Sequence, residues 1–219
     1  MRKSTTAIGQ LVSLATSGVD VKLRFRGSQA MTDGTTITLP EISLPSIEDK
    51  MPGYAWHESF HIRYTDFRSN ERKSATPMVH QLGNVIEDGR IERTALGEYP
   101  GSSRVMDKLI GSILETEDST LFHPPSKDLG APNILLGFAL NWTRKEINRY
   151  SSIKHLAEWR NAAESTFGSD LVVKIEEILE NTRTVDSTCE AYRAAKEIAE
   201  VLGEADQQPQ SQEPNSGDG

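Results

Sequence analysis

The sequence predicts an α+β fold in which a small β-sheet precedes a mostly helical carboxy-terminal half. Two segments near the amino end, residues 19–26 and 35–40, have the patterns expected of short strands. From Thr76 onward, apolar residues instead recur every three or four positions, which is typical of amphipathic helices. With 219 residues, 36% of them apolar, the chain can bury one core, and we expect one domain over residues 1–202.

The amino-terminal elements are predicted to be one helix and two strands. Residues 5–16 carry one apolar helical face, so a short amphipathic helix is expected there. Residues 19–26 alternate strictly between apolar and charged side chains, which predicts a half-buried strand. A second strand is expected over residues 35–40. Because proline donates no backbone hydrogen bond, Pro40 either ends a central strand or lies on an edge strand.

Proline and glycine are expected to divide the remaining chain into helices. A helical region that opens at Ser46 is predicted to break at Pro52 and Gly53, before the helix that carries two histidines. Residues 70–74 are polar and predict a second break. Further helices are predicted over residues 78–95, 105–114, 132–150, 153–167, 170–181 and 187–202.

Charge and composition exclude several classes of protein. The net charge of −8 comes partly from four acidic residues after Gly203, where the composition also changes, so residues 203–219 are predicted to be a disordered acidic tail or linker. This balance disfavours a nucleic-acid partner. No run approaches the about 20 apolar residues that span a membrane. The single cysteine, Cys189, is expected to be a packed thiol in a reducing compartment, which favours a cytoplasmic location.

The segment His57-Glu58-Ser59-Phe60-His61 has the pattern H-E-x-x-H. On a helix, two imidazoles four residues apart lie on one face and can share one metal ion, with the glutamate beside them as a general base. We therefore predict a Zn²⁺ site in which His57 and His61 are ligands and Glu58 activates a water molecule. A surface helix with paired histidines and no metal is the alternative.

A catalytic zinc ion needs a third protein ligand, and the predicted helix 78–95 offers two acidic candidates. Asp88 is favoured, because Glu92 lies four residues further on and can hold a histidine through its outer ring nitrogen. If Glu87 were the ligand, Ile91 would occupy that position. Glu87 therefore stays the alternative ligand.

Other residues of the same helix are expected to support the site. Thr76 and Pro77 form a strong helix start, with threonine as the N-cap and proline in the first turn. Asn84 lies one turn before the predicted ligand and is expected to brace the same surface. Gly89 is expected to let this helix pack closely against the histidine helix.

The predicted chemistry is hydrolysis of a peptide bond in a peptide or protein substrate. Glu58 would take a proton from the attacking water and deliver it to the leaving amine. Four residues are candidates to stabilise the oxyanion, and the sequence does not choose between them: His123, Tyr99, Tyr150 and Arg90.

The remaining motif residues have structural or substrate-binding interpretations. If residues 35–39 form an edge strand, Thr36, Ile37 and Thr38 could bind an extended substrate through main-chain hydrogen bonds, although a plain structural strand is an equal alternative. The other histidines are expected to be capped or solvent-facing: His80, His123 and His155. Five aromatic residues are expected to pack in the core or between helices: Trp56, Phe60, Tyr64, Trp142 and Trp159.

Three segments in order resemble the amino-terminal region of cobaltochelatase subunit T and related phage proteins. They are Thr32-Asp33-Gly34 with Ile37-Thr38-Leu39-Pro40, then His57-Glu58-x-x-His61, then Asn84-x-x-Glu87-Asp88-x-Arg90-x-Glu92. The resemblance covers residues 27–93. It implies a zincin-like metallopeptidase domain, a MoxR-type AAA+ ATPase as partner, a link to cobalamin biosynthesis, and a cytoplasmic protein, phage-encoded in one version.

Members of that family join this region through an acidic linker to a von Willebrand factor A domain. The acidic tail of this chain is similar to the start of such a linker, but the chain contains no A-domain and no P-loop. The resemblance therefore implies a fragment or a shortened relative. A non-catalytic, metal-stabilised subunit of a chelatase-like or AAA+ assembly is the second function it implies, and a metal-free interaction domain is a third.

Overall fold

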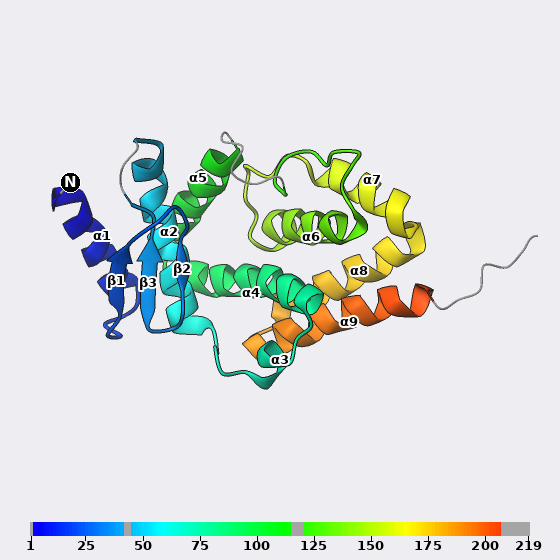
Figure 1. Ribbon diagram of the computed structural model, residues 1–219, viewed down its shortest axis with the longest axis horizontal. Coiled ribbons are helices and arrows are strands. Elements are labelled where there is room, and N and C mark those ends of the chain that lie inside the picture. Colours follow the sequence, from blue (N-terminus) through cyan, green and yellow to red (C-terminus); the bar gives the residue numbers. More distant parts are fainter. Residues whose placement is uncertain (1, 42–44, 115–120, 207–219) are drawn as a thin grey trace, which may run out of the picture.

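A three-stranded sheet lies at one end of the molecule and is followed by a series of helices (Figure 1). The computed structural model describes residues 2–41, 45–114 and 121–206. Within these residues the fold is α+β and mostly helical, as the sequence predicts. No helix in the described part of the chain combines the length and the apolar character needed to cross a membrane.

The sheet has the order β1-β3-β2, formed by β1 (Lys22–Phe25), β3 (Thr36–Leu39) and β2 (Met31–Thr32). β3 is parallel to β1 and antiparallel to β2. The predicted strand over residues 19–26 is therefore shorter than expected, and Val19 lies before it with 52% of its surface exposed.

Of the two positions considered for the second strand, the edge position is wrong, because β3 is the central strand. It pairs with β1 along all four residues, and Ile37 and Thr38 pair with β2 as well. Thr36, Ile37 and Thr38 therefore do not offer a free edge to a substrate. The sequence does not predict β2, because this strand has only two residues, too few to show an alternating pattern. Pro40 ends a central strand.

The helix that carries the histidines, α2 (Pro45–Tyr64), is continuous, so the predicted break at Pro52 and Gly53 is wrong. Gly53 has a packing role instead. A Cβ atom at this position would lie 2.6 Å from Cβ of Leu109, so only glycine allows α5 (Ser102–Leu114) to approach α2 this closely. On its other side α2 packs against α1 (Arg2–Ala15).

The helix after Thr76 begins as predicted and extends further. Thr76 Oγ1 accepts a hydrogen bond from Val79 N at the start of α4 (Pro77–Glu98), which runs across the middle of the molecule (Figure 1). The predicted polar break before it contains a short helix, α3 (Asn70–Lys73). Ser69 caps α3 by accepting a hydrogen bond from Arg72 N.

The remaining helices cover α4 and differ from the predictions mainly at their ends. α6 stops at Trp142, and the chain continues as a π-helical turn, where one straight helix was predicted. The predicted tail boundary at Gly203 is also wrong, because the last helix reaches Asp206; the rest of the tail lies outside the described residues. These elements are α6 (Ala131–Trp142), η1 (Thr143–Ile147), α7 (Leu156–Phe167), α8 (Ser169–Asn181), η2 (Thr182–Thr184) and α9 (Thr188–Asp206).

α4 contributes to two hydrophobic clusters. Leu82 and Ile86 pack in the cluster that contains Trp142 and Trp159, and Ile91 packs in the one that contains Phe60. Trp56 and Tyr64 are partly buried against the second cluster. The expected packing roles of these aromatic residues are confirmed.

Candidate metal centre

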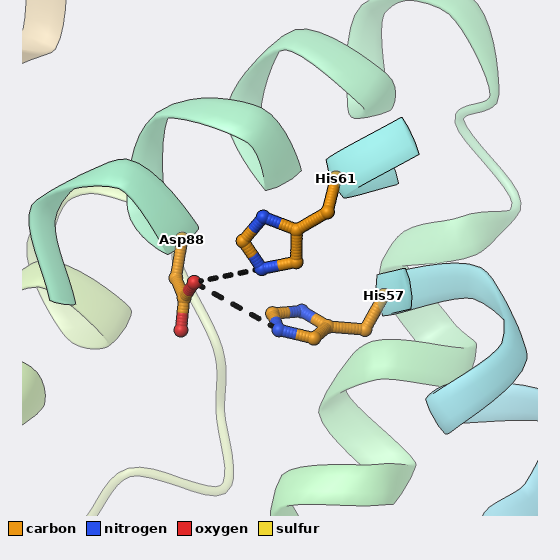
Figure 2. A group of neighbouring side chains, drawn as sticks. All are labelled: His57, His61 and Asp88. Carbon is orange, nitrogen blue, oxygen red and sulfur yellow. Dashed lines mark ion pairs between the residues drawn. The ribbon is translucent and has the colours of Figure 1, made fainter. Parts of the chain in front are cut away.

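Two histidines of α2 and one aspartate of α4 point toward one another (Figure 2). His61 Nε2 lies 3.1 Å from Asp88 Oδ1, and His57 Nε2 lies 3.8 Å from the same oxygen. One ligand atom from each of the three residues falls within 4.8 Å of the other two. These three residues can therefore hold a metal ion, and the structure brings together the three ligands that the sequence favoured.

His57 is held by Glu92, as predicted. His57 Nδ1 lies 2.9 Å from Glu92 Oε1, and the glutamate side chain is completely buried. The hydroxyl of Tyr150 donates a hydrogen bond of 2.8 Å to the other oxygen, Glu92 Oε2. When Nδ1 donates to the carboxylate, the lone pair of the neutral ring lies on Nε2, the atom that a metal ion would bind after displacing its proton.

His61 is held by a longer chain of hydrogen bonds. Its Nδ1 lies 2.9 Å from Thr65 Oγ1, and the threonine hydroxyl donates a bond of 2.8 Å to Glu87 Oε1. A hydroxyl has one proton, so Thr65 accepts the bond from His61. In the neutral ring the lone pair of His61 therefore also lies on Nε2, and in both rings this is the atom that faces Asp88.

Glu87, the alternative ligand, has a structural role. Arg90 donates to both of its carboxylate oxygens at 2.8 Å, and Thr188 Oγ1 of α9 donates to Oε1 at 2.8 Å. The Glu87 carboxylate is thus fully engaged in joining α4 to α2 and α9. Of the two acidic candidates, Asp88 is therefore the one that lies with His57 and His61 in a group that could hold a metal ion.

Arg144, on the π-helical turn η1, is a site residue that the sequence analysis missed. Its Nη2 donates to Asp88 Oδ2 at 3.2 Å, and its Nη1 forms an ion pair with Glu92 Oε2. Only 5% of its side chain is exposed. The guanidinium therefore joins the candidate ligand to the residue that holds His57. One signal was present in the sequence: Arg144 is the first charge after the apolar helix that begins at Ala131.

The charges around the site keep its two acids ionised. Burial acts to raise the pKa of Asp88, but His57, His61 and Arg144 outweigh it and hold the pKa below its usual range. Burial also acts to raise the pKa of Glu92, and Arg144 and His57 again lower it. Both carboxylates are therefore available as anions, Asp88 for a metal ion and Glu92 for His57.

The same charges act on His57 in the opposite direction. Burial alone would lower its pKa, but Asp88 and Glu92 outweigh burial and raise the pKa from 6.5 to about 9. A metal ion that binds Nε2 must displace a proton at neutral pH, so metal binding at this site depends on pH.

Glu58 lies beside the three ligands and lines a cavity of about 690 Å³ together with His57 and Asp88. Its side chain is buried, and this burial raises its pKa above the ordinary value, against the lowering effect of the two histidines. A carboxylate at the wall of a cavity next to a candidate metal centre is the arrangement that general-base catalysis requires.

Several predicted site residues lie elsewhere. Asn84 does not brace the site: it accepts a hydrogen bond from the Tyr192 hydroxyl of α9 and contacts His80. Gly89 does not pack against α2, because a Cβ atom there would lie 2.2 Å from Thr143 Cγ2 of η1. The structure thus uses Gly89 to bring Arg144, the residue after Thr143, close to α4.

The four oxyanion candidates, all in the described part of the chain, are not among the residues that line the cavity. The hydroxyl of Tyr150 bonds to Glu92, and Arg90 is paired with Glu87. The hydroxyl of Tyr99 accepts a hydrogen bond from Arg63. The fourth candidate, His123, lies in a bend before α6 and also does not line the cavity. Two cationic side chains do line the cavity: Arg144 and Lys50.

The chain was compared with protein-family models, with curated proteins and with solved structures, and none of the three comparisons found a match. The resemblance to cobaltochelatase subunit T therefore stays a prediction. What is known of the site is its geometry.

Proposed function

We propose that this protein is a zinc-dependent metallopeptidase with a zincin-like domain. One observation carries the proposal: Nε2 of His57, Nε2 of His61 and Oδ1 of Asp88 converge beside the buried carboxylate of Glu58, at the wall of a cavity. Two imidazoles, one carboxylate ligand and a neighbouring general base are the residue types that zinc hydrolases combine.

The donor set fits zinc in kind and in spacing. Zinc accepts imidazole nitrogen and carboxylate oxygen, and catalytic sites use three protein ligands and keep one position open. Ligand atoms at about 2.0 to 2.1 Å from a tetrahedral zinc ion lie roughly 3.3 Å from one another. The Nε2 to Oδ1 distances of 3.1 and 3.8 Å fall on either side of this value.

The residues of the site have distinct tasks in the proposed hydrolysis. A zinc ion held by His57, His61 and Asp88 would supply a water molecule of lowered pKa and a positive charge for the peptide carbonyl. Glu58 accepts a proton from the water as its oxygen attacks the carbonyl carbon. When the carbon–nitrogen bond breaks, Glu58 returns that proton to the leaving amine. Glu92 and Thr65 keep the rings of His57 and His61 oriented throughout.

Arg144 has a positioning task in the same proposal. It occupies Oδ2 of Asp88, so Oδ1 alone faces the two histidines. Oδ1 is therefore the Asp88 oxygen that would face a metal ion held with His57 and His61.

The family resemblance supports the proposal from a second direction, since the residues that carry it include the ones that converge here. A relative of cobaltochelatase subunit T would work with an AAA+ ATPase. A non-catalytic, metal-stabilised subunit of such an assembly is the alternative function. One observation favours it: the site also ties α2, α4 and η1 together through buried ion pairs.

The variant Glu58→Gln separates these functions. We expect the purified wild-type chain to hold about one zinc ion, measured by elemental mass spectrometry, and to cleave members of a peptide library. Glu58→Gln should keep the zinc and lose the cleavage. Glu200→Gln on α9, where the glutamate side chain is 59% exposed and pairs with Lys196, is a matched control that should keep both.

Two outcomes would count against the proposal. Zinc without any cleavage by the wild-type chain would favour the non-catalytic subunit. A chain that binds no zinc, and whose stability chelators leave unchanged, would favour the metal-free interaction domain.

A further inference from the structure

The cavity at the metal centre continues along α2 and is bounded by apolar side chains. Lys50, Tyr54, His57 and Glu58 line it from α2, so the lined face of that helix spans nine residues, or roughly 12 Å. Six further lining residues are large and apolar, and we call them the apolar wall: Met106, Leu109, Ile110, Ile113, Phe122 and Leu140. The cavity therefore combines a reactive polar part with a large apolar part.

The apolar wall is a built feature of the fold. Four of its residues are at positions 106, 109, 110 and 113 of α5, a spacing that places them on one helical face. That face is held against α2 by the contact between Leu109 and Gly53, where any side chain on Gly53 would collide. The glycine that the sequence analysis interpreted as a helix break thus sets the distance between the metal helix and the apolar wall.

We propose that this apolar wall binds a large aliphatic or aromatic side chain of the substrate, next to the bond that is cleaved. The inference rests on the proposed function and names its substrate class: peptides with an apolar residue beside the scissile bond. The volume of about 690 Å³ lies within the roughly 300 to 1,000 Å³ typical of ligand sites, so one such side chain and the adjoining backbone fit.

The distribution of charge around the cavity favours the same class of side chain. Charged lining residues of both signs come from α2, α4 and η1: Lys50, Glu58, Asp88, Glu92 and Arg144. The four lining residues of α5 carry no charge and no hydrogen-bonding side-chain group. An apolar side chain placed against them gains free energy from leaving water, whereas a charged one would lose hydration there without gaining a partner.

Amino-acid hydroxamates test the proposal, because the hydroxamate group binds zinc and the side chain probes the wall. Binding of glycine, alanine, leucine and aspartate hydroxamates to the zinc-loaded full chain is measured by calorimetry. Burial of each methylene favours binding by about fourfold, so leucine hydroxamate is expected to bind about tenfold to a hundredfold more tightly than glycine hydroxamate. Equal affinities for the two would overturn the proposal.

A variant of the wall gives a second, independent result. Ile113 is partly buried, so Ile113→Trp is expected to fill the apolar part of the cavity and to abolish the preference for leucine while acetohydroxamate still binds. Val173→Trp, at a position on α8 that is 43% exposed, is the control and should keep the preference. If Ile113→Trp does not fold, Ile113→Ala should shift the preference toward phenylalanine hydroxamate. A preference that neither variant changes would contradict the assignment to this wall.

The wall can also be tested without zinc, which separates this inference from the proposed function. If no hydroxamate binds because the chain holds no zinc, the proposed function fails. Methyl NMR of the full chain with N-acetyl-leucine methylamide, and with the glycine analogue as control, then decides the inference. Shifts of the Ile110 and Ile113 methyl signals by the leucine compound alone would support the apolar site, and their absence would overturn it.

Discussion

The two histidines of the candidate metal centre lie one turn apart on α2, and the structure supports them differently. His57 donates to the fully buried carboxylate of Glu92, which is also ion-paired with Arg144. His61 donates to the neutral hydroxyl of Thr65, and this hydroxyl in turn donates a hydrogen bond to Glu87. The spacing of four residues places both histidines on the same face of α2. Their electrostatic surroundings differ, because residues of α4 and η1 put charged groups beside His57.

This difference predicts unequal tasks. A carboxylate that accepts from a histidine ligand increases the basicity of the ring, whereas a hydroxyl mainly fixes its orientation. We therefore expect Glu92 to tune the affinity of His57 for a metal ion and Thr65 to orient the ring of His61. If both histidines are ligands, the contrast should appear when their partners are changed and disappear when the rings themselves are removed.

Removal of either ring is expected to have the largest effect. His57→Ala and His61→Ala each remove a ligand atom and should lower zinc affinity by more than the about 10- to 100-fold typical of a lost outer partner. Competition with a zinc chelator measures this affinity. His80→Ala, which loses a contact with Asn84 outside the site, is the control. Zinc affinity that survives either ligand substitution would exclude that histidine from the site.

Loss of Arg144 should have the next largest effect. Arg144→Met leaves the carboxylates of Asp88 and Glu92 without their buried partner, which typically costs about 3 to 5 kcal/mol of folding stability. Added zinc should restore part of this loss, because it supplies positive charge at Asp88. Urea unfolding with and without zinc measures both effects.

A matched control shows that burial is the cause. Arg160 is also paired with two acids, but 37% of its side chain is exposed, so Arg160→Met should cost no more than about 1 kcal/mol. If the two variants lose equal stability, the buried network at the site has no special role.

These expectations depend on residues that the sequence predicts unequally well. The pairs His57 with His61 and Asp88 with Glu92 lie four residues apart on one helix each, so periodicity alone places each pair on one face. The meeting of the two helices was inferred from chemistry, because a catalytic zinc ion needs a third ligand. That part of the site was predictable before the fold was known.

The parts that depend on contacts between distant segments were not predictable. Arg144 lies 56 positions after Asp88 in the chain and bonds to it from a π-helical turn. The spacing of apolar residues in the sequence does not predict such a turn. β3 became a central strand because a two-residue strand pairs with it. A glycine such as Gly53 is equally consistent with a helix break and with a close contact between two helices. Only the position of Leu109 in the fold shows that it is a close contact.

The pH dependence of folding stability should reveal how strongly the carboxylates of Asp88 and Glu92 stabilise the protonated ring of His57. Its pKa is raised to about 9 in the folded chain, so the protonated ring contributes stability that is fully present below pH 6.5 and is lost as the pH rises through about 9. The contribution is at most about 3 kcal/mol. Unfolding in urea with a chelator present, between pH 6 and 9.5, measures it.

Zinc should reverse this trend, because it competes with the proton at His57. Zinc affinity is expected to rise as the pH approaches 9. The variant His57→Gln has no titrating ring at this position. It should remove the contribution of His57 to the pH dependence of zinc-free stability and to the pH dependence of zinc affinity. Zinc-free stability that does not fall between pH 6.5 and 9 would show that Glu92 and Asp88 do not hold a proton on His57.

The smallest expected effect tests the comparison directly. Thr65→Val keeps the shape of the side chain but removes the hydroxyl, so His61 loses its Nδ1 partner while Glu87 keeps Arg90 and Thr188. Zinc affinity should fall by about tenfold or less, against about 10- to 100-fold for Glu92→Gln, which removes a charge behind His57. Thr188→Val is the matched control: it also removes a hydroxyl from Glu87 but has no contact with His61, so it should leave zinc affinity unchanged. Equal losses for Thr65→Val and Glu92→Gln would mean that orientation, and not charge, is what both partners supply.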